Sequence, residues 1–199
     1  MTENKPPCCC GIITPAILFT LVAVASFCCW AFSIRLFPSE VGLYVSCAIV
    51  FFGLGGLSLF PATGKAGAGN AIKLAISFAI GFSLYATLWS ICWFGLKNTF
   101  GEVAGSALGL LAFVFVLKKS SQISGSIFSA LTVVFFWHTI GYYLGDFIHY
   151  SILGKNPMPL NLFDSKETTA VVSRLAWGVF YGLGLGIGLS QILHKSRQT

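Results

Sequence analysis

Long apolar stretches, separated by short polar segments, run through the whole chain. A transmembrane helix needs about 20 mainly apolar residues, and six stretches reach or approach that length. We therefore expect transmembrane helices at residues 12–32, 41–60, 74–96, 102–117, 127–148 and 175–193. The fourth stretch is the shortest, and it crosses the hydrocarbon only if Glu102 reaches the headgroup region.

The composition agrees with this pattern, because 56% of the residues are hydrophobic and only 9% are charged, against about 25% charged residues in soluble domains. The apolar stretches use most of the 199 residues and leave no room for a separate soluble domain. We expect an all-α, polytopic integral membrane protein, in which one compact bundle of six transmembrane helices forms a single membrane-embedded domain over residues 1–199.

Basic residues are distributed unevenly between the two sides that six spans define. Seven lie in the terminal segments and in the connections on the same side, and five lie on the opposite side. The seven are Lys5, Lys65, Lys73, Lys118, Lys119, Lys195 and Arg197. Because basic residues accumulate in cytoplasmic loops, this excess indicates that both termini are cytoplasmic. The net charge of +6 fits attraction to membrane lipids and does not indicate a nucleic-acid partner.

The fifth stretch carries ionisable residues in a segment that otherwise belongs in lipid. His138, Tyr142, Asp146 and His149 recur at near-helical spacing, and at 100° per residue the two histidines lie within about 20° of each other around the helix. An ionisable side chain costs about 2.5–3.5 kcal/mol at the centre of a membrane helix, so it indicates a partner, a cavity or a function. Asp146 falls near the outer interface, where we expect it to pair with Arg174.

His138 falls near the middle of the bilayer and allows two interpretations. Its imidazole can hydrogen-bond to a neighbouring helix, and the third stretch offers four hydroxyl groups for this bond, on Ser83, Tyr85, Thr87 and Ser90. Alternatively, His138 acts as a proton-sensitive gate or relay, because an imidazole titrates near neutral pH.

Three aromatic residues lie near the predicted outer ends of the stretches, at Trp93, Tyr150 and Trp177. Amphipathic aromatic rings commonly sit at the headgroup level of membrane helices. We therefore interpret these three residues as an aromatic belt that anchors the bundle.

Glycines at a spacing of four residues recur in the predicted helices. Gly178, Gly182 and Gly186 form such a series in the sixth stretch, and Gly141 and Gly145 form a pair in the fifth. Small residues at this spacing let membrane helices approach closely. These faces indicate tight packing within the bundle, or alternatively a homo-oligomeric seam or a helix that lines a narrow pore.

The cysteines do not indicate a disulfide framework, since none of the seven falls in a predicted outer loop. Cys8, Cys9 and Cys10 stand just before the first stretch and have three readings: lipidation beside a membrane helix, thiolate ligation of a metal, or a small apolar lead-in. Structural zinc sites need a second pair of ligands at suitable spacing, which the chain lacks, so we expect no metal site.

Motifs of common enzymes are absent from the sequence, including HExxH and the Gly-x-Ser-x-Gly elbow. Two histidines on one helix cannot bind haem from opposite sides, and we expect neither a cofactor nor enzyme activity. Two functions remain. The first is a channel or transporter for protons, ions or a small polar solute, with the fifth helix lining or gating the path. The alternative is a non-catalytic subunit of a larger membrane complex, so that the protein partners are copies of this chain or other membrane subunits.

Overall fold

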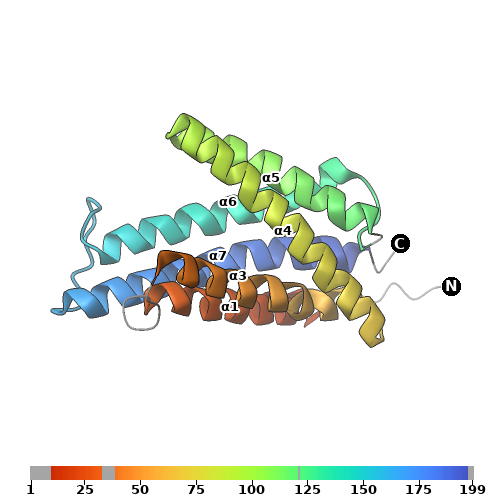
Figure 1. Cartoon of the computed structure of the whole chain (residues 1–199), viewed down its shortest axis with the longest axis horizontal. Helices are drawn as coiled ribbons and strands as arrows, with labels where there is room; N and C mark the ends of the chain where they lie inside the picture. The colour runs from red at the N-terminus through yellow and green to blue at the C-terminus, as the bar shows by residue number, and fades with distance from the viewer. Residues whose placement is uncertain (1–9, 33–38, 121, 197–199) are drawn as a thin grey trace.

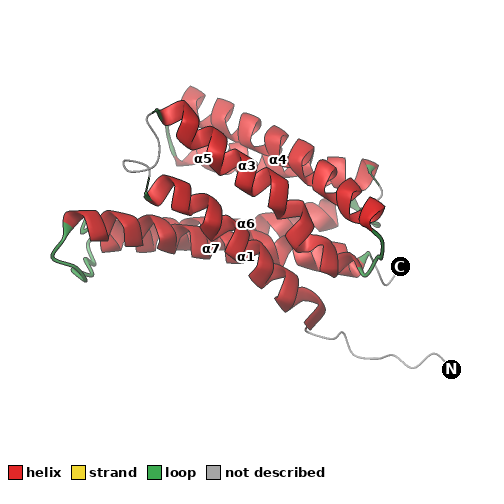
Figure 2. Cartoon of the chain, turned by 60° about the horizontal axis from the view of Figure 1, so that its bottom comes forward, coloured by secondary structure: helices red, strands yellow, loops and turns green. Residues whose placement is uncertain are grey.

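The computed structural model describes residues 10–32, 39–120 and 122–196, and its regular elements are helices throughout (Figures 1 and 2). Those elements are α1 (Cys10–Ala31), α3 (Glu40–Leu59), the short 3₁₀ helix η1 (Phe60–Thr63), α4 (Ala68–Leu96), α5 (Thr99–Lys119), α6 (Ile127–Ile152) and α7 (Lys166–Lys195). Among the described residues, six helices are long and apolar enough to cross a membrane. The predicted all-α bundle of six membrane helices is confirmed.

Several helices extend beyond the apolar stretches that predict them. The Asn98 side chain accepts a hydrogen bond from the Gly101 amide at 2.9 Å, and α5 therefore begins at Thr99 rather than at Glu102. The Ser165 hydroxyl accepts one from the Thr168 amide at 3.3 Å, and α7 begins at Lys166, well before residue 175. These N-caps satisfy backbone amides that hydropathy does not register, which explains the longer helices.

The first and last described helices meet at one end of the bundle. A Cβ atom placed on Gly11, at the start of α1, would lie 2.6 Å from Cε1 of His194, near the end of α7. We call this the terminal end, and we call the end that holds Ala31 and Lys166 the far end (Figure 1). The described parts of α1 and α7 thus begin and end on one side, as six spans require; that this side is cytoplasmic stays a prediction.

The six helices form a closed ring in which α1, α3, α4, α5, α6 and α7 follow one another and α7 returns to α1. The most extensive interfaces join α7 to α1, α7 to α6, and α4 to α5. The α4–α5 hairpin crosses the other helices at an angle (Figure 1, yellow and green). The ring therefore contains two tightly packed units, the α1/α6/α7 unit and the α4–α5 hairpin, with α3 between α1 and α4.

Glycines hold the α1/α6/α7 unit together. One face of α7 packs on α1, where Cβ atoms on Gly178 and Gly182 would lie 2.9 Å from Phe27 Cγ and 2.8 Å from Ala23 Cβ. Gly186 continues this face against Ala16. On the other face of α7, Gly184 approaches Gly141 of α6, while Gly145 of α6 lies against Trp177. Backbone therefore meets backbone or side chain with no space for added carbon atoms.

The α4–α5 hairpin uses the same device. A Cβ atom on Gly105 or Gly109 of α5 would lie 2.9 Å from Trp89 Cα or 2.8 Å from the Tyr85 carbonyl oxygen. Gly101 lies equally close to the Cys92 carbonyl oxygen, at 2.8 Å. The hairpin thus has a glycine seam along its length.

An apolar core joins the two units toward the terminal end. The rings of Phe19 (α1), Phe78 (α4) and Phe113 (α5) are at most 1% exposed, and Phe78 lies 5.8 Å and 5.4 Å from the other two ring centroids, in edge-to-face geometry. Leucines of α5 and α7 complete this core, including Leu110, Leu185 and Leu189. Close packing of this kind leaves no room for a solute to pass.

Candidate functional site

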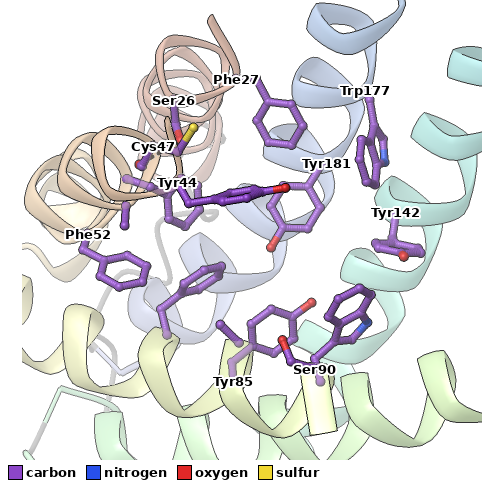
Figure 3. A pocket seen from close by; sticks show the side chains of 15 residues that line it. Ser26, Phe27, Tyr44, Cys47, Phe52, Tyr85, Ser90, Tyr142, Trp177 and Tyr181 are labelled. Atoms are coloured by element: carbon purple, nitrogen blue, oxygen red, sulfur yellow. Dashed lines mark hydrogen bonds between the residues drawn. The ribbon is translucent and has the colours of Figure 1, made fainter. Parts of the chain in front are cut away.

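A cavity of about 350 Å³ lies between α1, α3, α4, α6 and α7 (Figure 3). Ten aromatic side chains form most of its wall: Phe27, Tyr44, Phe51, Phe52, Phe82, Tyr85, Trp89, Tyr142, Trp177 and Tyr181. Its volume falls in the usual range for small-molecule sites of roughly 300–1,000 Å³. We call it the aromatic cavity.

The aromatic cavity opens where α3 and α4 diverge. These two helices touch near their connection, where Gly55 and Gly56 lie against Phe78 and Ala75. Beyond that contact the wall includes Phe82 and, closer to the far end, Tyr44, which is 65% exposed. The cavity is therefore a wedge, closed by the apolar core toward the terminal end and open beside Tyr44.

A second cavity of about 410 Å³ shares Ser26, Phe27, Tyr44, Cys47, Trp89 and Trp177 with the first and adds Trp30, at the last turn of α1. The hollow space thus extends toward the far end of the bundle. It lies on the far-end side of the packed rings of Phe19, Phe78 and Phe113.

The wall of the aromatic cavity bears no formally charged side chain among its lining residues. Its polar groups are the hydroxyls of four tyrosines, Ser26 and Ser90, and the thiol of Cys47. The Ser26 hydroxyl donates to the Cys47 carbonyl oxygen at 3.0 Å. The indole N–H groups of Trp89 and Trp177 are buried and have no acceptor within the described part of the chain. The wall can therefore hold an apolar or aromatic body and offers only a few hydrogen-bonding groups.

His138 lies directly behind this wall and is 1% exposed. Its Nε2 atom lies 2.7 Å from the Tyr85 hydroxyl, so Tyr85 is the partner among the four hydroxyl residues considered above. The imidazole also stacks on Tyr142 at 5.8 Å and meets Tyr181 edge-on at 5.7 Å between ring centroids. All three tyrosines line the cavity. His138 therefore holds the base of the cavity together without reaching into it.

The Nδ1 atom of His138 has no hydrogen-bond partner within residues 10–32, 39–120 and 122–196. A neutral imidazole that accepts through Nε2 would leave an N–H at Nδ1 without an acceptor, and one that donates through Nε2 would leave a lone pair. In either tautomer the Tyr85 contact at Nε2 is kept and the Nδ1 side stays unsatisfied among the described residues.

Tyr142 connects the cavity to two carboxylates. Its hydroxyl donates to Oε1 of Glu102 on α5 at 3.5 Å, a long hydrogen bond between α6 and the hairpin. Asp146, one turn further along α6, is half-buried and is an electrostatic neighbour of both Glu102 and His149. Both acids thus lie near the far end, behind Tyr142.

Arg174 and His149 form a separate cluster at the far end with Trp30. The Arg174 guanidinium donates to the Trp30 carbonyl oxygen at 2.9 Å and lies 4.9 Å above the Trp30 ring centroid. The His149 imidazole stacks on the same indole at 5.9 Å. Arg174 therefore caps the end of α1 instead of forming the predicted pair with Asp146. The physical reason is that the last carbonyl groups of a helix lack intrahelical donors, and a guanidinium supplies them.

The structure thus brings Tyr142 into the cavity wall, places His138 behind it, and separates Asp146 from Arg174. Gly141, Gly145, Gly178, Gly182 and Gly186 lie in helix interfaces and outside the cavity wall. Cys8 and Cys9 lie outside the described residues, and of Cys10 only the backbone, at the start of α1, is described. In the described ranges no group of three or more His, Cys, Asp or Glu side chains could hold a metal ion.

Sequence reasoning missed the wall residues Tyr44, Trp89, Trp177 and Tyr181. Trp177 in particular was expected in an aromatic belt, yet its ring packs inside the bundle against Phe27 and Tyr142, at 5.6 Å and 6.0 Å. A usable signal exists in the chain, because tyrosines recur in the middle of the α4, α6 and α7 segments, at Tyr85, Tyr142 and Tyr181. A hydroxyl in the hydrocarbon needs a partner or a cavity.

Comparisons of the chain with protein-family models, with curated proteins and with solved structures find no match. The features of this chain that bear on function are the geometry of the aromatic cavity and its position in an integral, multi-pass membrane bundle.

Proposed function

We propose that this chain is a small membrane transporter whose aromatic cavity binds an organic solute, with α6 lining the path through Tyr142. The observation that carries the proposal is the wedge itself. An aromatic cavity lies between two glycine-packed units, it opens toward the far end of the bundle, and a packed apolar core lies on its terminal-end side. We place the terminal end in the cytoplasm, because the described residues Lys65, Lys73, Lys118, Lys119 and Lys195 lie there.

The closed core favours a transporter over an open channel. Transport by alternating access requires a solute site near the membrane centre and two bodies that rock about it. The α1/α6/α7 unit and the α4–α5 hairpin are suitable bodies, because each is held by its own glycine seam. Polar contacts that join them at the base of the cavity include Tyr85 with His138 and Tyr142 with Glu102, and the apolar core joins them toward the terminal end.

The wall chemistry favours an uncharged or singly cationic organic solute. Aromatic faces attract apolar rings and also cations, through the negative face of each ring. A small anion would find no cationic side chain among the lining residues. A bare metal ion would find only hydroxyl and thiol groups, which are poor substitutes for its hydration shell. The nearest carboxylates, Glu102 and Asp146, add a negative potential on the far side of Tyr142.

Uptake into proteoliposomes that contain only this chain tests the proposal. Three probes of similar size are compared: a neutral aromatic amide, an aromatic quaternary ammonium and an aromatic carboxylate. We expect uptake of the first two above protein-free vesicles and none of the third. Ala48→Trp, which fills the cavity from α3, should abolish uptake. Its matched control, Ile49→Trp, faces outward on the same helix and should leave uptake intact.

Equal uptake by both variants, or no uptake of any probe by well-folded protein, would contradict a transport function through this cavity. Binding can be followed independently of transport through Trp89 and Trp177, since both indoles line the cavity and their fluorescence should change when a probe binds.

A second candidate function is a non-catalytic subunit of a larger membrane complex. It is favoured by a hollow of about 510 Å³ between α5 and α6, lined by residues such as Ala107, Leu131, Phe136 and Ile140. Phe136 is 56% exposed there, and a partner transmembrane helix could cover it. Purification in mild detergent separates the two functions: a stoichiometric foreign membrane chain would favour the subunit, and this chain alone, with uptake activity, would favour the transporter.

A further inference from the structure

A basic cavity of about 260 Å³ lies at the terminal end, far from the aromatic cavity. Three chain segments that are distant in sequence form it: η1 and the turn after it, the connection between α5 and α6, and the end of α7. Its polar lining residues are Thr63, Lys65, Lys118, Gln122, Ser124 and Ser196.

The walls of the basic cavity are tied together by hydrogen bonds. The backbone N–H of Gln122 donates to the Leu117 carbonyl oxygen at 2.9 Å, which folds this part of the connection back onto the end of α5. The Ser124 amide donates to the Ser196 hydroxyl at 2.8 Å, which joins the connection to α7. The Lys118 ammonium donates to the Gly125 carbonyl oxygen. Residues 122–125 are therefore fixed by hydrogen bonds to α5 and to the end of α7.

Gln122 is the unusual residue of this lining. It is 3% exposed, and its side-chain nitrogen Nε2 donates to the Ser120 carbonyl oxygen at 3.2 Å. Its amide oxygen is buried and has no donor within the described part of the chain. Buried polar atoms are paired in the large majority of cases, and an acceptor without a donor costs about 1–3 kcal/mol. A hydroxyl-bearing ligand would supply the missing donor.

The distribution of charged residues also favours an anionic ligand in the basic cavity. Two lysines line the basic cavity, and Lys73, Lys119 and Lys195 lie at the same end of the bundle. None of the acidic residues in the described part of the chain lies at this end, because Glu40, Glu102, Asp146, Asp164 and Glu167 all belong to the far end. Basic pockets between membrane helices on the cytoplasmic side are suited to anionic lipid headgroups.

A smaller hollow with a mixed polar and apolar lining adjoins the basic cavity. This hollow of about 180 Å³ shares Ser124 with the basic cavity and runs between α6 and α7. Its lining combines the apolar side chains of Ala130, Val133 and Ile192 with polar ones, namely Ser124, Ser126, Ser129, Gln191 and Lys195. A molecule with a phosphate at the lysines therefore has an adjoining surface for a hydrocarbon chain, and a free phosphate does not need one.

We propose that the basic cavity binds the headgroup of an anionic phospholipid that carries a free hydroxyl beside its phosphate, as phosphatidylglycerol and phosphatidylinositol do. Lys65 and Lys118 pair with the phosphate, the Gln122 oxygen accepts a hydrogen bond from the headgroup hydroxyl, and the hollow beside Ser124 takes part of an acyl chain. This site is independent of the proposed transport function.

Lipid binding by the purified, delipidated full chain in detergent tests the proposal, with native mass spectrometry as the readout. The probes are phosphatidylglycerol, phosphatidic acid, phosphatidylcholine with the same acyl chains, and inorganic phosphate. A lysine near an anionic headgroup is worth about 1 kcal/mol, which corresponds to about fivefold in affinity. We expect Lys65→Gln with Lys118→Gln to weaken phosphatidylglycerol binding about 25-fold.

The matched control is Lys73→Gln with Lys119→Gln, which removes the same charge at the same end but outside the cavity lining. This control should change binding less than twofold. An equal loss in both double variants would show that only the general surface charge matters and would overturn the site. Lys118→Arg should retain binding, which separates loss of charge from loss of fold.

Gln122 provides a second readout, because the proposal predicts that wild-type protein prefers phosphatidylglycerol over phosphatidic acid, which lacks the headgroup hydroxyl. Gln122→Leu should remove this preference while leaving binding of phosphatidic acid in place. No preference in the wild type would overturn the role of Gln122. Binding of inorganic phosphate with the same dependence on Lys65 and Lys118, and no gain from acyl chains, would overturn the lipid as the source of the phosphate.

Discussion

The hydroxyl of Tyr85 and the Nε2 atom of His138 lie 2.7 Å apart at the base of the aromatic cavity. Tyr85 belongs to the α4–α5 hairpin and His138 to the α1/α6/α7 unit, so this hydrogen bond directly joins the two packed units of the bundle. Both residues are buried, with Tyr85 6% and His138 1% exposed. This hydrogen bond therefore links the α4–α5 hairpin to the α1/α6/α7 unit, and it also fixes the position of Tyr85 in the wall of the aromatic cavity.

Tyr85→Phe should destabilise the protein by about 1–3 kcal/mol, because it removes the hydroxyl and leaves the buried imidazole without its partner. Reversible unfolding in mixed micelles measures the change. Tyr150→Phe is the control, since Tyr150 is a partly exposed tyrosine at the far end, and it should change stability by no more than about 0.5 kcal/mol. Equal stability of the two variants would show that the Tyr85–His138 bond contributes nothing.

Gly184→Ala should be much more damaging than Gly53→Ala. A Cβ atom on Gly184 would lie 2.7 Å from Gly141 Cα, where backbone meets backbone, and overpacking of this kind costs about 1–3 kcal/mol. A Cβ atom on Gly53 would find no heavy atom within 4 Å, so alanine there should be neutral or stabilise α3 by up to about 1 kcal/mol. Thermal unfolding in detergent measures both, and a similar shift for the two variants would contradict the close α6–α7 interface.

Hydropathy was sufficient to predict the six membrane helices, because crossing lipid requires long apolar segments with internally bonded backbone. It could not predict the ends of α5 and α7, where Asn98 and Ser165 cap polar turns that extend the helices. Helix length in this bundle therefore depends on local capping as well as on the thickness of the hydrocarbon.

The site was only partly predictable, because periodicity describes one helix at a time. It marked Tyr142 and His138 on α6, but the choice of Tyr85 among four hydroxyl residues depends on how α4 lies against α6. The same limit explains why the partner of Arg174 was not predicted from the sequence. Proximity along the membrane normal suggested Asp146 as its partner, whereas the close packing of α1 on α7 brings the Trp30 carbonyl oxygen within 2.9 Å.

Arg174→Ala should destabilise the protein by about 1.5–3 kcal/mol, the usual value of a hydrogen bond from a charged group, since the Trp30 carbonyl oxygen then loses its donor. Asp146 and Arg174 form no ion pair with each other among the described residues, and both are electrostatic neighbours of His149. In a double-mutant cycle the coupling energy between Arg174→Ala and Asp146→Asn should therefore stay below about 1 kcal/mol, the indirect contribution that runs through His149. Unfolding measurements on the wild type, both single variants and the double variant give this energy, and a coupling of 1 kcal/mol or more would favour an Arg174–Asp146 ion pair.

Cys47 offers a direct test of the wedge, because its side chain lines the aromatic cavity while Cys92 of α4 lies at the glycine seam with α5. Two proteins are compared that retain only Cys47 or only Cys92, with the other cysteines replaced by alanine. A small membrane-permeant maleimide should label Cys47 faster than Cys92. A probe that fills the cavity, present at ten times its dissociation constant, should slow labelling of Cys47 about tenfold by mass action and leave Cys92 unchanged. Mass spectrometry of timed samples measures both rates. Slower labelling at both positions would indicate a general tightening of the bundle, and no protection of Cys47 by a probe that quenches Trp89 and Trp177 would place the probe outside the cavity.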